Sequence, residues 1–215
     1  MMKTGKNKRL LASILAASML LAMSPFALAE GTEGQEQPVE GGGTEQTCAA
    51  KIGENKYPTL AGALAAANIY DANSDVTIVM LHDVTENIEI NRSLTLDLGG
   101  HTLSGDGDAE AAVVTISGDK PQVTVKNGTV TGGKKSGIRI TDADVTLTKL
   151  TVTKNASTGN GGGIDAVKGK ELVVEQCAIN ENTAKNSGGG IRVEDTPLKV
   201  IDSEIKNNRG FHGAG

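Results

Sequence analysis

Short runs in which apolar and polar residues alternate recur through the second half of the chain. Alternation of this kind predicts β-strands that bury one face and expose the other to solvent. The runs come in groups of three, and Gly, Asn, Asp and Lys separate them. Equivalent aliphatic positions return every 26 or 27 residues, so each group of three strands is one structural repeat. The clearest equivalent positions are Ile138, Ile164 and Ile191; Val145, Leu172 and Leu198; and Val152, Ile179 and Ile205.

A repeat this short has no room for a crossover helix between its strands. We therefore predict that each repeat forms one turn of an all-β solenoid, a right-handed, single-stranded parallel β-helix with three short strands per turn. Each strand would pair with its counterpart about 4.8 Å away in the next turn, and the inward aliphatic residues would form continuous ladders. The β-helix is expected over residues 76–215, with degenerate first turns. A β-sandwich gives no reason for three non-equivalent strands to repeat at this period.

Three asparagines, Asn155, Asn182 and Asn208, each follow the last aliphatic residue of a repeat by three positions. Asparagine tolerates left-handed backbone and its amide can hydrogen-bond a neighbouring turn, so we predict a structural ladder at these positions. Glycine runs follow at 161–163 and 188–190, where they permit a tight return to the next strand. Because no Lys-Ser or Lys-Thr pair follows either run, we do not interpret them as phosphate-binding loops.

Residues 48–75 are expected to form a cap, a hairpin followed by a helix, over the N-terminal end of the solenoid. Residues 50–57 have the two short runs of a hairpin. The helix is predicted to begin after Thr59 as its N-cap, with Leu60 and Leu64 on one face. A stack of parallel strands needs such a cover because its end strands otherwise leave backbone groups unpaired.

Residues 1–29 have the pattern of an export signal: a basic start, an apolar run and small residues at the end. Cleavage is predicted between Ala29 and Glu30. A retained membrane anchor is the alternative, but the apolar run is short and Pro25 interrupts it. Residues 30–47 are rich in Gly and Glu and almost free of apolar residues, so we predict a flexible acidic linker.

Loss of the signal would make the chain more acidic. Residues 1–29 hold four of the 21 basic residues and none of the 26 acidic ones, so the net charge would go from −5 to −9. Such a field repels phosphate backbones and anionic lipid, so we expect no nucleic-acid partner and no membrane insertion of the mature chain.

Cys48 and Cys177 would permit one disulfide in an oxidising compartment. Cys177 has an inward position and is interpreted as a small buried hydrophobe, which leaves the pairing open.

Several motifs resemble known families. The stretches from Ala50 to Leu60, from Ile78 to Ile88 and from Leu94 to Gly105 resemble the start of secreted right-handed β-helix proteins of Gram-positive gut-type bacteria. The Gly-Gly-Gly-Ile and Asn repeats are similar to those of polymorphic outer-membrane proteins and of the pectin-lyase-like superfamily. The resemblance implies the fold over about residues 50–215. It does not imply one activity, since that superfamily includes lyases, hydrolases and adhesins.

The sequence gives no catalytic set. The Asn-Thr-Asp, Asp-Asp, Gly-His-Gly and Arg-Ile-Lys motifs of a polygalacturonase-like site are absent, so we assign no catalytic residue and no cofactor. A pectate-lyase-like site would need Ca²⁺-binding carboxylates beside a basic residue. The candidates are Asp106 with Asp108 and Asp142 with Asp144, although aspartate is also common in turns for backbone reasons.

One outward row is a candidate binding surface. Arg139, Asp165 and Arg192 occupy the middle of the first strand in successive repeats, which predicts a stacked Arg–Asp–Arg row. It is either a solvated salt-bridge row of little energetic weight or part of a saccharide groove. With two Tyr and two Phe in the whole chain, there is no obvious aromatic platform for sugar rings.

The function predicted from these patterns is a secreted or cell-surface β-solenoid that serves as an adhesin-like stalk or interaction scaffold rather than an enzyme. Its partner would be a polysaccharide or a host or cell-surface protein. The alternative is a polysaccharide lyase or glycoside hydrolase of the pectin-lyase-like type. Because residues 208–215 resemble an earlier glycine loop and no cap follows, the chain is interpreted as C-terminally truncated. The active site of such an enzyme would then lie mostly in the missing turns.

Overall fold

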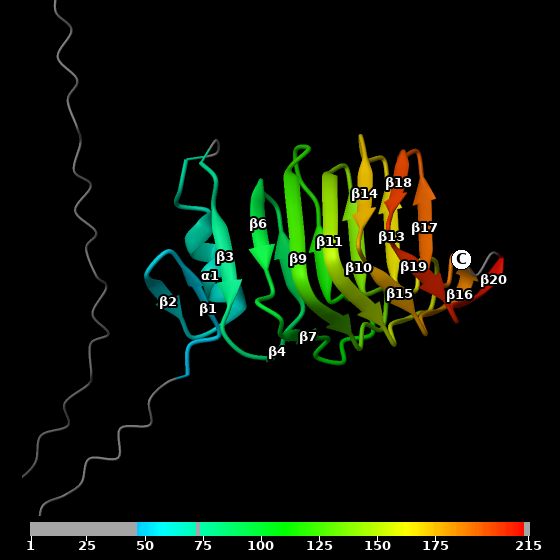
Figure 1. The fold of residues 1–215 in the computed structure, drawn as a ribbon, viewed down its shortest axis with the longest axis horizontal. Helices are drawn as coiled ribbons and strands as arrows, with labels where there is room; N and C mark the ends of the chain where they lie inside the picture. Colours follow the sequence, from blue (N-terminus) through cyan, green and yellow to red (C-terminus); the bar gives the residue numbers. More distant parts are fainter. Residues whose placement is uncertain (1–46, 72–73, 213–215) are drawn as a thin grey trace, which may run out of the picture. The chain divides into compact units, whose positions relative to one another are not determined.

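Twenty strands and one helix make up the part of the chain that the computed structural model describes, residues 47–71 and 74–212. Apart from β1, which pairs antiparallel with β2 and β3, the strands pair in parallel with their counterparts one turn away (Figure 1). The helix is α1 (Leu60–Ala67). The twelve-stranded sheet contains β1 (Ala50–Ile52), β2 (Asn55–Tyr57), β3 (Thr77–Met80), β4 (Val84–Thr85), β6 (Leu94–Asp97), β7 (Thr102–Ser104), β9 (Gln122–Thr131), β11 (Asp144–Thr153), β14 (Leu172–Glu175), β15 (Ala178–Asn180), β18 (Leu198–Ile201) and β19 (Glu204–Lys206). The five-stranded sheet contains β5 (Ile88–Ile90), β8 (Val114–Ile116), β10 (Ile138–Thr141), β13 (Ile164–Val167) and β17 (Ile191–Glu194), and the three-stranded sheet contains β12 (Ala156–Ser157), β16 (Thr183–Ser187) and β20 (Arg209–His212).

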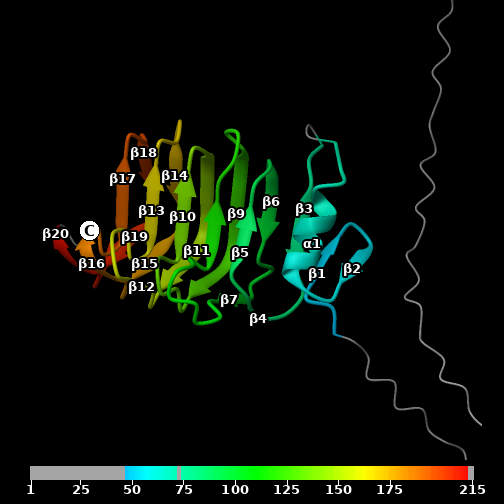
Figure 2. The same cartoon turned by 180° about the vertical axis from the view of Figure 1, so that it is seen from behind.

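The register of these sheets is the one that the repeat predicts. Ile138 of β10 pairs with Ile164 of β13, which pairs with Ile191 of β17. Figure 2 shows these strands side by side in the five-stranded sheet, one strand for each turn. The prediction of a parallel β-helix with a short N-terminal helix is therefore confirmed.

The core is a narrow column of stacked aliphatic side chains between the sheets. Ile138 of β10 and Leu147 and Val152 of β11, which belong to a single turn, are all completely buried. Burying such a side chain contributes about 1.5–3 kcal/mol, but a single turn covers only part of it. The stack is stable because each turn closes the core of its neighbours.

The second and third strands of a turn are less separate than the sequence pattern predicts. In β9 and β11 they form one continuous strand that bends at Asn127 and at Lys149, whose φ angles are 57° and 54°. Gln176 and Asp202, with φ of 53° and 47°, make the same corner in the next two turns. One left-handed residue thus turns the chain at each such corner, although left-handed backbone costs an L-residue about 1–2 kcal/mol.

The predicted asparagine ladder lies at another corner, with one difference. The left-handed residues are Lys154, Glu181 and Asn207, each one position before a ladder asparagine, and the ladder asparagines themselves do not have positive φ. Asn155 and Asn182 instead turn inward and are 1 % and 0 % exposed. The physical reason is that a left-handed residue reverses the side-chain direction, so the residue that follows it can point into the core.

Each inward amide joins two turns. Asn155 Nδ2 donates to Asn182 Oδ1 and Asn182 Nδ2 donates to Asn208 Oδ1, both at 3.0 Å. Asn182 Nδ2 also donates to the Val152 carbonyl at 2.9 Å, and Asn182 Oδ1 accepts from the Asn155 backbone N–H at 3.1 Å. The ladder therefore satisfies buried backbone groups that no strand pairs.

Helix α1 covers the first turn. Thr59 accepts a hydrogen bond from the Gly62 N–H at 3.0 Å, as an N-cap does, and Leu60 and Leu64 are buried against the first strands. The Glu86 carboxylate accepts from the Leu60 and Ala61 N–H groups at 3.2 and 2.9 Å. At the other end of the helix, the Arg92 guanidinium donates to the carbonyl of the last helical residue and to two carbonyls of the chain that follows. These are Ala67, Tyr70 and Asp71.

The predicted signal peptide (1–29), its cleavage site at Ala29 and Glu30, and the linker up to residue 46 lie outside the described residues.

Candidate functional site

The predicted row of Arg139, Asp165 and Arg192 is in register across β10, β13 and β17. It is not a solvated Arg–Asp–Arg row, because Asp165 is only 4 % exposed. Arg192 Nη1 donates to Asp165 Oδ1 at 2.9 Å and Nη2 pairs with Glu194 in the same strand. Within the described part of the chain Arg139 forms no ion pair. The ion pairs at this place therefore join Arg192 to Asp165 and to Glu194.

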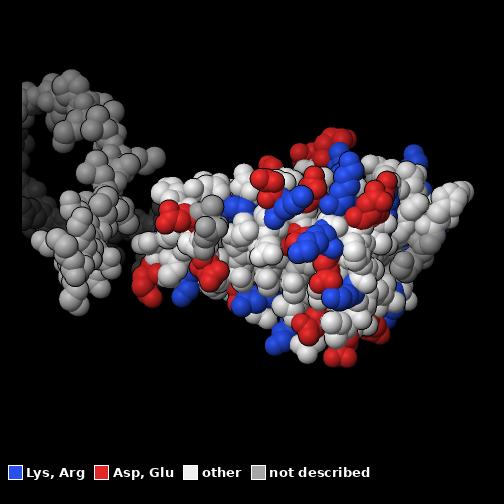
Figure 3. Space-filling model, turned by 90° about the horizontal axis from the view of Figure 1, so that it is seen from above, with Lys and Arg blue, Asp and Glu red and all other residues white. Residues whose placement is uncertain are grey.

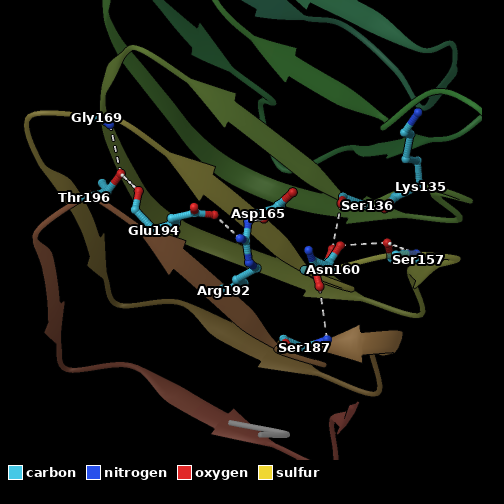
Figure 4. A network of polar contacts seen from close by, with 12 residues as sticks. Lys135, Ser136, Ser157, Asn160, Asp165, Gly169, Ser187, Arg192, Glu194 and Thr196 are labelled. Carbon is cyan, nitrogen blue, oxygen red and sulfur yellow. Dashed lines mark hydrogen bonds and ion pairs between the residues drawn. The ribbon is translucent and has the colours of Figure 1, made fainter. Parts of the chain in front are cut away.

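A glycine loop buries Asp165. Any side chain at Gly161 would collide with Asp165 Cβ, so only glycine lets the loop pack this closely over β13. The loop is fixed by hydrogen bonds that Figure 4 shows: Ser136 Oγ donates to the Gly161 carbonyl at 2.6 Å, and Asn160 Oδ1 accepts from the Ser187 N–H at 3.2 Å. The hydrogen bond with Asp165 raises the pKa of Arg192, and the same contact holds two turns together.

Three of the four candidate calcium ligands, Asp106, Asp108 and Asp144, accept hydrogen bonds from backbone N–H groups, and Asp144 begins strand β11. Asp106 Oδ1 accepts from the Asp108 N–H at 2.9 Å, and Asp144 Oδ1 accepts from the Lys170 N–H at 2.9 Å. Asp142 occupies a left-handed corner with φ of 56°. Among residues 47–71 and 74–212, no three His, Cys, Asp or Glu side chains gather as a metal site would require.

Cys177 lies in the core, as its inward position predicts, and is 4 % exposed. Its thiol contacts the carbonyls of Leu147 at 3.4 Å and Glu175 at 3.2 Å, and no disulfide joins it to Cys48. Burial raises the pKa of the Cys177 thiol because the thiolate would lose its hydration. Cys177 is therefore a protonated core residue rather than a nucleophile.

Sequence reasoning missed a groove on the outer face of the twelve-stranded sheet. Thr95 of β6, Thr124 of β9 and Thr146 of β11 are in register there. Two hollows of about 430 and 420 Å³ adjoin along this row and share Gln122 and Thr124. We call this surface the threonine groove. Its solvent-facing lining is Ser74, Asp75, Ser93, Thr95, Gln122, Thr124, Asp144, Thr146, Lys170, Glu171 and Val173.

Two of the four charged side chains of the threonine groove already have protein partners. Asp144 accepts from the Lys170 backbone, and Glu171 forms a 2.6 Å ion pair with Lys199 of the next turn. By contrast, the hydroxyls of Thr124 and Thr146 make no hydrogen bond within the described residues. Seen from above in Figure 3, basic and acidic side chains are intermixed over the solenoid, without a field of one sign. The groove thus offers unpaired neutral hydroxyls between charged groups of which more are acidic than basic.

Comparison with protein families found one match, to the model described as the right-handed β-helix region, over residues 65–215. The matched stretch covers the solenoid and the last three residues of α1. The chain belongs to the right-handed β-helix family. Neither the curated proteins nor the solved structures contain a match to it. Within the described residues of this β-helix, no helix is long and apolar enough to cross a lipid bilayer.

Proposed function

We propose that this β-helix protein is a secreted or cell-surface scaffold, adhesin-like in its role, that binds a partner through an outer face of the solenoid. The observation that carries the proposal is the register of the outward side chains. Thr77, Thr95, Thr124 and Thr146 repeat one group at strand spacing over successive turns, about 4.8 Å apart. A surface of this kind can meet a repeated or extended partner at many equivalent points.

The buried Asp165 and its ion pair also support a scaffold. Arg192 binds Asp165 of the preceding turn and Glu194 of its own strand, so the Asp165–Arg192 pair serves to join turns. A general acid or base has to reach the group whose proton it transfers, and Asp165 at 4 % exposure does not. Export rests on the signal pattern of residues 1–29, and attachment to a cell surface would follow only from a partner found there.

Two measurements test the proposal. The first is the N-terminal sequence of the chain recovered from the medium of a secreting bacterium, which is expected to begin at Glu30. The second is saturable binding of the chain to surfaces coated with polysaccharides, mucin or matrix protein, with reaction products assayed in parallel, with and without Ca²⁺. Binding without products supports a scaffold. Release of sugar products would favour a polysaccharide lyase or glycoside hydrolase instead, and retention inside the cell would contradict export.

A further inference from the structure

The threonine groove has the geometry of a site for a linear polymer. It crosses β6, β9 and β11, so it runs along the solenoid axis rather than along one strand. Its hydroxyls stack at the strand spacing of about 4.8 Å. This spacing is close to the rise of one sugar in an extended β-linked glycan. Resting on the function proposed above, we propose that the groove binds one extended chain of a neutral β-1,4-linked polysaccharide, with successive sugars over successive turns.

The charges of the groove exclude an acidic polymer. Its lining has three carboxylates, at Asp75, Asp144 and Glu171, against one ammonium group at Lys170. Two lysines close to the lining, Lys199 and Lys126, are already paired with the carboxylates of Glu171 and Asp97. A polyuronate or nucleic acid would bring its charges against these carboxylates without a cluster of Arg or Lys to compensate them. A neutral polymer meets no such repulsion.

The groove also lacks what a protein partner needs. Protein interfaces are anchored by aromatic and large apolar side chains that become fully buried. Among the solvent-facing side chains of the groove only Val173 is apolar. Sugar hydroxyls, like those of Thr124 and Thr146, both donate and accept, so the two sets match. Because no aromatic ring lines the groove, hydrogen bonds have to carry the binding, and loss of a few hydroxyls would weaken it strongly.

The test uses affinity electrophoresis of the chain in native gels that contain one of three probes. Hydroxyethylcellulose is a neutral β-1,4-linked glucan, glycogen is a neutral α-linked glucan whose chains coil, and polygalacturonate is acidic. The variant Thr124→Val/Thr146→Val removes two groove hydroxyls and keeps the shape and β-propensity of the side chains. The matched control is Thr129→Val/Thr151→Val, which removes two outward hydroxyls from the same strands beyond the corner at Asn127 and Lys149.

We expect retardation by hydroxyethylcellulose alone. The groove variant should lower the affinity at least about fivefold, since each hydrogen bond contributes up to about tenfold. The control variant should retain the affinity of the parent, and both variants should unfold at the temperature of the parent. Retardation by glycogen or polygalacturonate alone, no retardation, or equal losses in both variants would overturn the proposal. Binding to a protein-coated surface with no glycan bound would overturn this inference and leave the scaffold function standing.

Discussion

The capping helix and the asparagine ladder both contain backbone groups that are hydrogen-bonded by side chains, but the two places use different kinds of side chain. Both lie where backbone N–H and C=O groups have no strand to pair with, and both receive hydrogen bonds from side chains 20 to 30 residues away. At α1 the side chains are charged: Glu86 binds the first N–H groups and Arg92 binds the carbonyls beyond the last turn. In the ladder they are neutral amides, and Asn182 is completely buried.

The difference follows from the solvent at each place. Glu86 and Arg92 are only half-buried, so their charges keep part of their hydration while they bind the ends of the helix. A charge at Asn182 would lose nearly all hydration, which costs several kcal/mol, whereas an amide can donate and accept at once. We therefore expect the cap to tolerate substitution and the ladder to tolerate very little.

The largest effect is expected from Asn182→Asp, which preserves the shape of the side chain. The variant would place a carboxylate oxygen against the Val152 carbonyl and Asn208 Oδ1, where Asn182 donates now. We expect a loss of about 3–5 kcal/mol in the free energy of unfolding at pH 7, measured by urea titration. Burial raises the folded-state pKa of the new carboxyl above its unfolded value of about 3.9. The loss should therefore be complete above the folded pKa and fade as the pH falls through it towards 3.9.

The control for this variant is Asn186→Asp, which adds the same charge at an exposed position in β16. Its stability should stay within about 0.5 kcal/mol of the parent at every pH. A gap between the two variants that does not change between pH 7 and pH 4 would contradict the electrostatic account of the ladder.

A smaller effect is expected at the cap from Arg92→Ala. The variant removes the guanidinium from three carbonyls, but Ala67 and Asp71 keep the backbone donors Tyr70 N–H and Ser74 N–H, and the exposed Tyr70 carbonyl can bind water instead. We expect a loss of about 1–2 kcal/mol, together with faster hydrogen exchange of the amides in α1. Arg92→Lys should restore only part of it, because one ammonium group cannot reach carbonyls that the planar guanidinium bridges. Full recovery with lysine would show that charge alone holds the helix.

At the other end of α1, Glu86→Gln should cost about 0.3–1 kcal/mol. Leu60 N–H and Ala61 N–H now donate to different oxygens of the carboxylate, so the single amide oxygen of the glutamine can keep one of these hydrogen bonds, and the exposed Ala61 N–H can bind water instead. The main loss is then the attraction between the carboxylate and the helix dipole. The expected loss should shrink as salt is added, because ions screen a charge that is partly in solvent. Glu89→Gln, at an exposed position of β5, is the matched control and should leave the stability unchanged. A loss that is independent of salt would contradict the dipole account.

The aliphatic positions that recur in every turn could be predicted from the sequence. The burial of a single side chain in one turn could not. Ile138, Ile164 and Ile191 could be aligned because every turn places the same kind of residue at the same inward position. The burial of Asp165 could not be predicted, since it depends on how closely Gly161 packs over the strand, and a glycine run has no periodic signal for that contact. Alternation identifies an outward position but not what folds over it.

Other features gave a signal too general to interpret. Thr95, Thr124 and Thr146 are at outward strand positions where β-propensity alone explains threonine, so the groove appears only once the turns are stacked. The partners of α1, Glu86 and Arg92, come from the chain segment around β5, and nothing in their spacing indicates a helix end. The signal that could have indicated the threonine groove is the recurrence of an uncharged hydroxyl residue at the same outward position in successive repeats.

The smallest expected effect is a gain, from Glu181→Gly beside the ladder. Glu181 has φ of 55° and an exposed side chain, and no hydrogen bond of that side chain is found in the described chain. Glycine removes the cost of left-handed backbone, about 1–2 kcal/mol, but adds about 0.5–1 kcal/mol of chain entropy to the unfolded state. The net gain is about 0.5 kcal/mol, or a rise of about 1–2 °C in Tm. Glu175→Gly in β14, where φ is negative, has the entropy cost without the relief and should lower Tm. If both variants lowered Tm alike, the left-handed backbone at Glu181 would carry no cost that glycine can relieve.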